Sequence, residues 1–227
     1  MRTDDEIRND VIEEVRLEPQ LADIAPRIGV TVKDEVVTLS GVVDHYTQKL
    51  AAEKAAQRVK GVKVVAVDIE VKGDAVSIEP TDAEIGEAIR NALAWHSAVN
   101  QDQIEIVVDN GWVELEGAVN WDYERKAAEK AIQNIRGVKG VVNKVRIKAK
   151  EVDASEIKSK IGKAFYRHAS VDADNISVEV HQNMVTLKGK VSSWVEREEA
   201  EDVAWSMPGV TQVVNNLVID TQIYAGQ

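Results

Sequence analysis

The segment WVELEGAVNWDYERKAAEKAIQNIRGV, residues 112–138, decides the fold, because its pattern occurs three times in the chain. The corresponding segments are residues 36–62 and 184–210. In each copy one glycine ends a short alternating stretch, and a second glycine follows twenty residues later. The pairs are Gly41 and Gly61, Gly117 and Gly137, and Gly189 and Gly209. A spacing kept three times without an insertion indicates one packed unit, because a slip of one residue would turn its buried face outward.

The repeat also sets the number of domains. The first glycines of the pairs lie 76 and 72 residues apart (117 − 41 and 189 − 117), so the 227 residues divide into three domains of similar size. We expect the repeats at residues 1–73, 80–150 and 153–221. Domains of this length are near the lower limit for independent folding, since a chain of about 60 residues buries only about 60% of its surface.

Hydrophobic periodicity predicts the same elements in each repeat. Apolar residues four apart, such as Ile85, Ile89 and Leu93, predict an amphipathic first helix. Alternating strands follow on both sides of a turn, which is Asp-Asn-Gly at 109–111 in the middle copy. A second helix between the two glycines and a last strand complete the repeat. The fold class is α/β (α+β): three tandem α-β-β-α-β units, each a three-stranded mixed sheet with two helices on one face.

Charge excludes one class of partner. The net charge is −11, and the thirds of the chain carry similar shares of it: −4 for residues 1–78 (11 basic, 15 acidic), −3 for 79–151 (10 and 13) and −4 for 152–227 (7 and 11). Because nucleic-acid affinity depends on neutralising phosphates, we expect no nucleic-acid partner. Simple electrostatic adsorption to anionic lipid is disfavoured for the same reason.

The sequence shows no transmembrane segment, because no stretch approaches the roughly 18 apolar residues that such a span needs. The N-terminal residues are acidic and already helical in pattern, without the basic and apolar regions of an export signal. We therefore expect a cytoplasmic protein if Met1 is the native start, and a periplasmic one if an export signal was removed. The sequence does not reveal the oligomeric state.

Three recurring motifs resemble the BON domain, named for bacterial osmotically inducible and nodulation proteins. They are V-T/E-L-x-G, E-R-x-x-A-E and G-V-x-x-V-V-N, and together they cover nearly the whole chain. Their positions are Val37–Gly41, Val113–Gly117 and Val185–Gly189; Glu124–Glu129 and Glu196–Glu201; and Gly137–Asn143 and Gly209–Asn215. The first copy departs from the pattern, with Gln48 and Lys49 for Glu-Arg and Val67 for the final asparagine. We expect that this copy lacks a surface role that the others keep.

The resemblance implies a non-enzymatic α/β module associated with phospholipid or envelope interaction, osmotic stress and attachment to other modules. It also implies an alternative, because a cytoplasmic member of the family binds potassium. The residues themselves agree with the absence of catalysis. The four histidines form no paired ligand motif, phosphate-binding glycine loops are absent, and there is no cysteine. We predict no catalytic residues, no cofactor-binding residues, no metal ligands and no cofactor.

Aromatic and arginine side chains near the start of the second helix are the candidate surface binding residues. They are Tyr46, Trp121, Tyr123, Arg125, Trp194 and Arg197. The aromatic residues either dock at a lipid interface or partner, or close the start of the helix as hydrophobic staples, with residues 193–196 as a capping box. The arginines either bind phosphate or pair with nearby glutamates. The six repeated glycines are assigned to structure: turns and close backbone approach.

Three functions follow as hypotheses. The leading one is a non-enzymatic adaptor that acts at a phospholipid surface or on a protein partner under envelope or osmotic stress. The second is a cytoplasmic protein that binds a monovalent cation such as potassium. The third is a self-associating structural scaffold.

Overall fold

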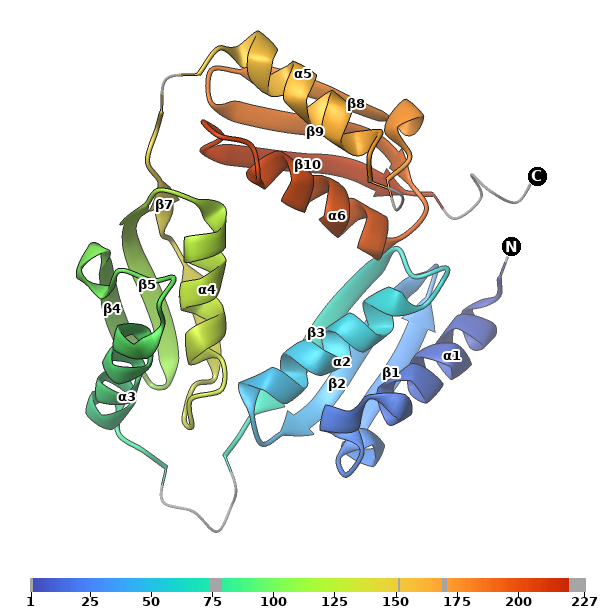
Figure 1. Ribbon diagram of the computed structural model, residues 1–227. Helices are drawn as coiled ribbons and strands as arrows, with labels where there is room; N and C mark the ends of the chain where they lie inside the picture. Colours follow the sequence, from blue (N-terminus) through green and yellow to red (C-terminus); the bar gives the residue numbers. More distant parts are fainter. Residues whose placement is uncertain (1, 74–78, 151, 169–170, 221–227) are drawn as a thin grey trace. The chain divides into compact units, whose positions relative to one another are not determined.

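The computed structural model describes residues 2–73, 79–150, 152–168 and 171–220, and it contains three α/β units in chain order (Figure 1). The first unit comprises α1 (Asp4–Leu17), β1 (Ile28–Lys33), β2 (Val36–Val43), α2 (Tyr46–Arg58) and β3 (Val64–Val71), with 3-10 turns η1 (Pro19–Leu21) and η2 (Ala25–Arg27). The second comprises α3 (Asp82–Trp95), η3 (Gln101–Gln103), β4 (Ile104–Asp109), β5 (Trp112–Val119), α4 (Asp122–Ile132), β6 (Gly140–Asn143) and β7 (Arg146–Ile147). The third comprises α5 (Ala154–Phe165), η4 (Ala173–Asn175), β8 (Ile176–His181), β9 (Met184–Val191), α6 (Trp194–Trp205) and β10 (Gln212–Ile219).

Each sheet is mixed, and its strands follow one another in chain order. The first two strands of a unit pair antiparallel through a tight hairpin, and the third pairs parallel with the second after the helical crossover. In the second unit the last strand is interrupted, so that β6 and the short β7 both pair with β5. The predicted fold class of three tandem α-β-β-α-β units is confirmed.

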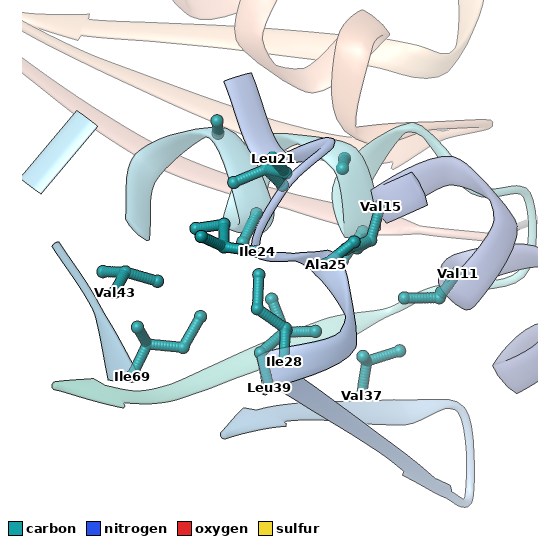
Figure 2. Close-up of a cluster of buried hydrophobic side chains, with 14 of the residues drawn as sticks. Val11, Val15, Leu21, Ile24, Ala25, Ile28, Val37, Leu39, Val43 and Ile69 are labelled. Carbon is teal, nitrogen blue, oxygen red and sulfur yellow. The ribbon is translucent and has the colours of Figure 1, made fainter. Parts of the chain in front are cut away.

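The core of each unit lies between the two helices and one face of the sheet. In the first unit, Ile7, Val11 and Val15 of α1 pack with Leu39 of β2 and with small alanines of α2. Figure 2 shows how Leu21 and Ile24, from the turns after α1, close the same cluster. The buried residues of α2 are all alanines, and these small side chains let the helix lie close to the sheet. The opposite face of each sheet carries the alternate, more exposed residues.

An aspartate of the first helix fixes the hairpin turn in two of the three units. The carboxylate of Asp82 accepts hydrogen bonds from the backbone N–H groups of Asn110 (2.8 Å) and Gly111 (2.9 Å). Asp4 holds the first unit's turn in the same way. In the third unit the corresponding residue is Ala154, and the amide of Asn183, in the turn itself, donates to the carbonyl of Lys150 (2.9 Å) instead. The hairpin is therefore tied to the first helix of its unit in the first two repeats, and to the segment just before that helix in the third.

The glycine that follows the V-x-L motif has no room for a side chain. Gly117 has φ of +135°, and a Cβ there would lie 2.0 Å from the carbonyl oxygen of Gln103, on the neighbouring chain segment. Gly41 and Gly189 have φ of +137° and +132° and meet the carbonyls of Arg27 and Asn175 at 2.3 and 2.1 Å. The second glycine of each pair also has positive φ, between +90° and +103°. The repeated glycines thus occupy positions where the backbone itself requires glycine.

None of the helices within the described residues is long and apolar enough to cross a membrane.

Candidate functional site

The E-R-x-x-A-E and G-V-x-x-V-V-N motifs meet in space as a structural clasp. In the third unit, the side-chain amide of Asn215 in β10 donates to the carbonyl of Arg197 (3.2 Å) and to the carboxylate of Glu201 (2.8 Å), both in α6. Its side-chain oxygen accepts from the N–H of Leu217 at 3.2 Å. The asparagine therefore joins the second helix to the last strand.

The second unit has the same clasp. Asn143 donates to the carbonyl of Arg125 and to Glu129, each at 3.1 Å, and accepts from Val145 at 3.2 Å. The first unit has Val67 at this position, which packs against the apolar core. The side chains of Asn143 and Asn215 are engaged within their own domains, so the surface role expected of the second and third repeats is not carried at this position. The first repeat has replaced a hydrogen-bonded clasp by apolar contact.

We predict that Asn215→Val destabilises the third unit by about 1–2 kcal/mol, because Glu201 and the Arg197 carbonyl lose their donor in a partly buried site. Hydrogen exchange of peptides from α6 and β10 measures this loss within one domain. The matched control is Asn216→Val, next in sequence and exposed on the other face of the strand, which should change protection little. Equal protection of Asn215→Val and the parent would show that the clasp contributes nothing.

A buried carboxylate organises the loop that precedes α6. Glu196 is 4% exposed and accepts hydrogen bonds from the N–H and hydroxyl of Ser192, each at 2.7 Å, and from the N–H of Asp172 at 2.9 Å. Ser193 caps the helix by accepting from the N–H of Glu196 (3.2 Å). The predicted capping box is therefore only half right, since the glutamate side chain reaches Ser192 rather than the capping serine. Its role is to fasten the loop to the helix.

The candidates Trp194 and Arg197 both face inward in the third unit. The ring of Trp194 packs against the hydrophobic core, and its indole Nε1 is buried without a hydrogen-bond partner. The guanidinium of Arg197 lies 5.4 Å from the centre of that ring and donates to the carbonyls of Asn215 (2.9 Å) and Leu217 (3.3 Å). An arginine bound to its own strand is a poor phosphate ligand, and the tryptophan packs against the core of its own domain.

Two further candidates are also partly engaged. Tyr46, the first residue of α2, is half-buried against the core of the first unit, and this burial raises the pKa of its phenol. Arg125 is partly buried, and its backbone carbonyl accepts from Asn143. Neither residue presents a fully exposed side chain to a ligand.

The remaining candidates, Trp121 and Tyr123, are exposed at the start of α4. Their side chains are 38% and 59% exposed. Two exposed tryptophans lie outside the predicted binding residues: Trp112, 52% exposed at the start of β5, and Trp95, 90% exposed at the end of α3. The sequence does indicate that Trp112 is exposed, because in an alternating strand it directly precedes Val113, which is buried. Of the aromatic residues that the structure describes, the exposed ones belong mainly to the second repeat, with Tyr166 of the third as the exception.

The histidines do not assemble a metal site. Among the residues that the structure places, there is no group of three or more His, Cys, Asp or Glu side chains able to hold a metal ion. His168 instead pairs through Nδ1 with Glu199 at 2.9 Å, which joins the end of α5 to α6. This contact has a structural role.

Comparison with known proteins also divides the chain into three domains. A model of the BON domain matches residues 3–73, 81–149 and 153–221. Osmotically-inducible protein Y of Escherichia coli (strain K12) is 28% identical over 147 residues, which are 60% of this chain and 71% of that protein. An uncharacterized protein in the gshII 5' region of Anaplasma centrale is 29% identical over 123 residues, covering 53% of this chain and 82% of that protein.

Solved structures give only distant similarity. CdsD, a structural protein of the type III secretion system of Chlamydia trachomatis, has 13% identity and a TM-score of 0.27, with 95% of this chain and 92% of that one covered. The periplasmic domain of PrgH has 13% identity and a TM-score of 0.23, with 86% and 95% covered. TM-scores this low support no conclusion about this chain.

Proposed function

Since this chain belongs to the BON domain family, we propose that it is a non-enzymatic binding protein of the osmotic or envelope stress response that associates with phospholipid surfaces through its second domain. The stress assignment draws on the similarity to an osmotically inducible protein. The proposal that the protein is not an enzyme rests on the family, whose members are not known as enzymes.

One observation carries the choice of domain. The second repeat exposes Trp121 and Tyr123 at the start of α4, whereas the described part of the first repeat exposes no aromatic side chain to a similar degree. Tryptophan and tyrosine suit the boundary between lipid and water, because the ring gains from apolar burial while its N–H or O–H stays hydrated. This concentration of exposed aromatic surface supports the second domain as the binding domain.

The charges support an apolar rather than an electrostatic association. The net charge of −11 repels anionic lipid, and Arg197 is occupied by backbone carbonyls of its own domain. Membrane association must therefore come from burial of aromatic surface, worth roughly 25 cal/mol per Å². Such binding is weak and depends little on salt.

We predict that the protein floats with phospholipid vesicles to a similar extent at low and physiological salt. The double variant Trp121→Ala, Tyr123→Ala should lose most of this binding while its circular dichroism stays native. The matched control is Tyr166→Ala, which removes a 73% exposed tyrosine from the third domain and should bind like the parent.

Vesicle flotation also discriminates the hypotheses. If the parent fails to float with vesicles of any composition, the lipid proposal is wrong. Calorimetric titration with potassium and sodium then tests the remaining alternative. Cation binding without flotation would replace the proposed function by that of a cation-binding protein.

A further inference from the structure

The uncovered face of the second sheet carries an apolar patch of three side chains. Val107 of β4 is 59% exposed, Trp112 of β5 is 52% exposed and Val142 of β6 is 42% exposed. Val107 and Trp112 have the parity opposite to the buried residues of their strands, so they point away from α3 and α4. Val142 lies on the same face, because it pairs with Glu114, which has the parity of Trp112. The patch crosses all three strands, because Glu114 of β5 pairs with Val107 on one side and with Val142 on the other.

The largest of these side chains lies over a glycine. Trp112 pairs with Gly140 in the parallel ladder, and a Cβ at Gly140 would lie 2.3 Å from the Trp112 ring. The ring therefore lies flat across the neighbouring strand instead of standing away from the sheet. The first and third units have Val36 and Met184 in place of this tryptophan, with Val64 and Gln212 in place of the glycine. The flat aromatic platform is thus particular to the second sheet.

Acidic residues surround this platform at positions where the other repeats have none. The acidic residues of the second sheet's uncovered face are Glu105, Asp109, Glu114 and Glu116. The corresponding residues are Gly29, Lys33, Thr38 and Ser40 in the first sheet, and Ser177, His181, Thr186 and Lys188 in the third. Since the three units share one backbone register, this difference cannot come from the fold.

We propose that the uncovered face of the second sheet binds a positively charged polypeptide segment that carries apolar side chains. The apolar side chains of the segment would cover Val107, Trp112 and Val142, and its lysine or arginine residues would pair with the surrounding carboxylates. This proposal does not rest on the association with lipid, which was assigned to the start of α4.

Charge complementarity identifies the occupant. Lys144 donates to Glu114 at 2.5 Å and lies 3.9 Å from Glu116, so it offsets part of the acidic charge. Glu105 and Glu116 stand directly opposite each other on β4 and β5. Like charges at such a pair destabilise a sheet, and a cationic group placed between them removes that repulsion. Anionic lipid and nucleic acid would add to the repulsion instead.

The experiment is a titration of the full-length protein with two synthetic peptides, one alternating lysine and valine and the other alternating glutamate and valine. Fluorescence anisotropy of a dye-labelled peptide reports binding. We expect the lysine peptide to bind, with an affinity that falls as salt is added, and the glutamate peptide not to bind. Failure of the lysine peptide to bind would overturn the proposal.

The test variant is Glu105→Ser, Glu116→Lys, which gives the second sheet the residues that the third sheet carries at Ser177 and Lys188. It should weaken the lysine peptide at least tenfold. The control Glu13→Ser, Glu198→Lys makes the same change in net charge at exposed positions of α1 and α6 and should change affinity less than twofold. If both variants weaken binding equally, the attraction belongs to the overall charge of the chain and the proposal is wrong.

The apolar part of the surface has its own variant. Trp112→Val introduces the residue that the first sheet has at this position and should weaken the lysine peptide at least fivefold at high salt, where charge pairing is screened. Vesicle flotation of these variants should match the parent, which separates this surface from the proposed lipid-binding residues. An unchanged affinity of Trp112→Val would show that the platform is not part of a docking surface.

Discussion

Replacing Gly117 by valine will destabilise the second domain by at least about 3 kcal/mol, the largest loss that we expect from a single substitution in this chain. Two costs add at this position. A β-branched residue is forced into φ of +135°, and its Cβ is placed 2.0 Å from the carbonyl oxygen of Gln103. That carbonyl belongs to the backbone immediately before β4, so relief requires the first strand of the sheet to move.

Hydrogen exchange of peptides from β4 and β5 measures this effect, since a single unfolding free energy is not defined for a chain of three domains. The matched control is Gly162→Ala in the interior of α5, where an added Cβ meets nothing within 4 Å. Alanine is favoured over glycine in a helix by roughly 0.5–1 kcal/mol, so this control should be neutral or stabilising. If the two variants behave alike, the conformation of Gly117 does not matter for stability.

The sequence predicted the architecture because its signals were local and repeated three times. Alternation fixed the faces of the strands, and the constant spacing of the glycines placed the crossover helix between them. The interruption between β6 and β7 was not predictable, because Lys144 and Val145 continue an apparently regular strand pattern in the second repeat. Strand order also required the structure, since composition and periodicity say nothing about which edge receives the third strand.

The candidate site was harder to predict, because the sequence does not show which way a side chain turns at a helix start. Trp121 and Trp194 lie four and five residues after their glycines, and this shift of one position separates an exposed side chain from one packed on the core. Arg197 looked available to a ligand, yet it reaches back to carbonyls of a strand about twenty residues away.

Trp194→Ala is the second substitution from which we expect a large effect, a loss of about 2–3 kcal/mol in the third domain. Full removal of a buried tryptophan costs roughly 3–5 kcal/mol, and this side chain is only partly buried. Part of the loss comes from the core contact and part from Arg197, whose guanidinium would lose the aromatic ring at 5.4 Å while still bound to β10.

The test compares Trp194→Ala with Trp95→Ala, which removes a tryptophan that is 90% exposed at the end of α3 and should change stability by no more than about 0.5 kcal/mol. Hydrogen exchange in α6 and β10 reports the first variant, and exchange in α3 reports the second. If Trp194 acts as a staple, the Trp194→Ala variant should show lower protection in α6 and should still float with vesicles when folded. Native protection together with lost vesicle binding would instead make Trp194 a lipid contact, because an interfacial tryptophan contributes to association and leaves the stability of its own domain unchanged.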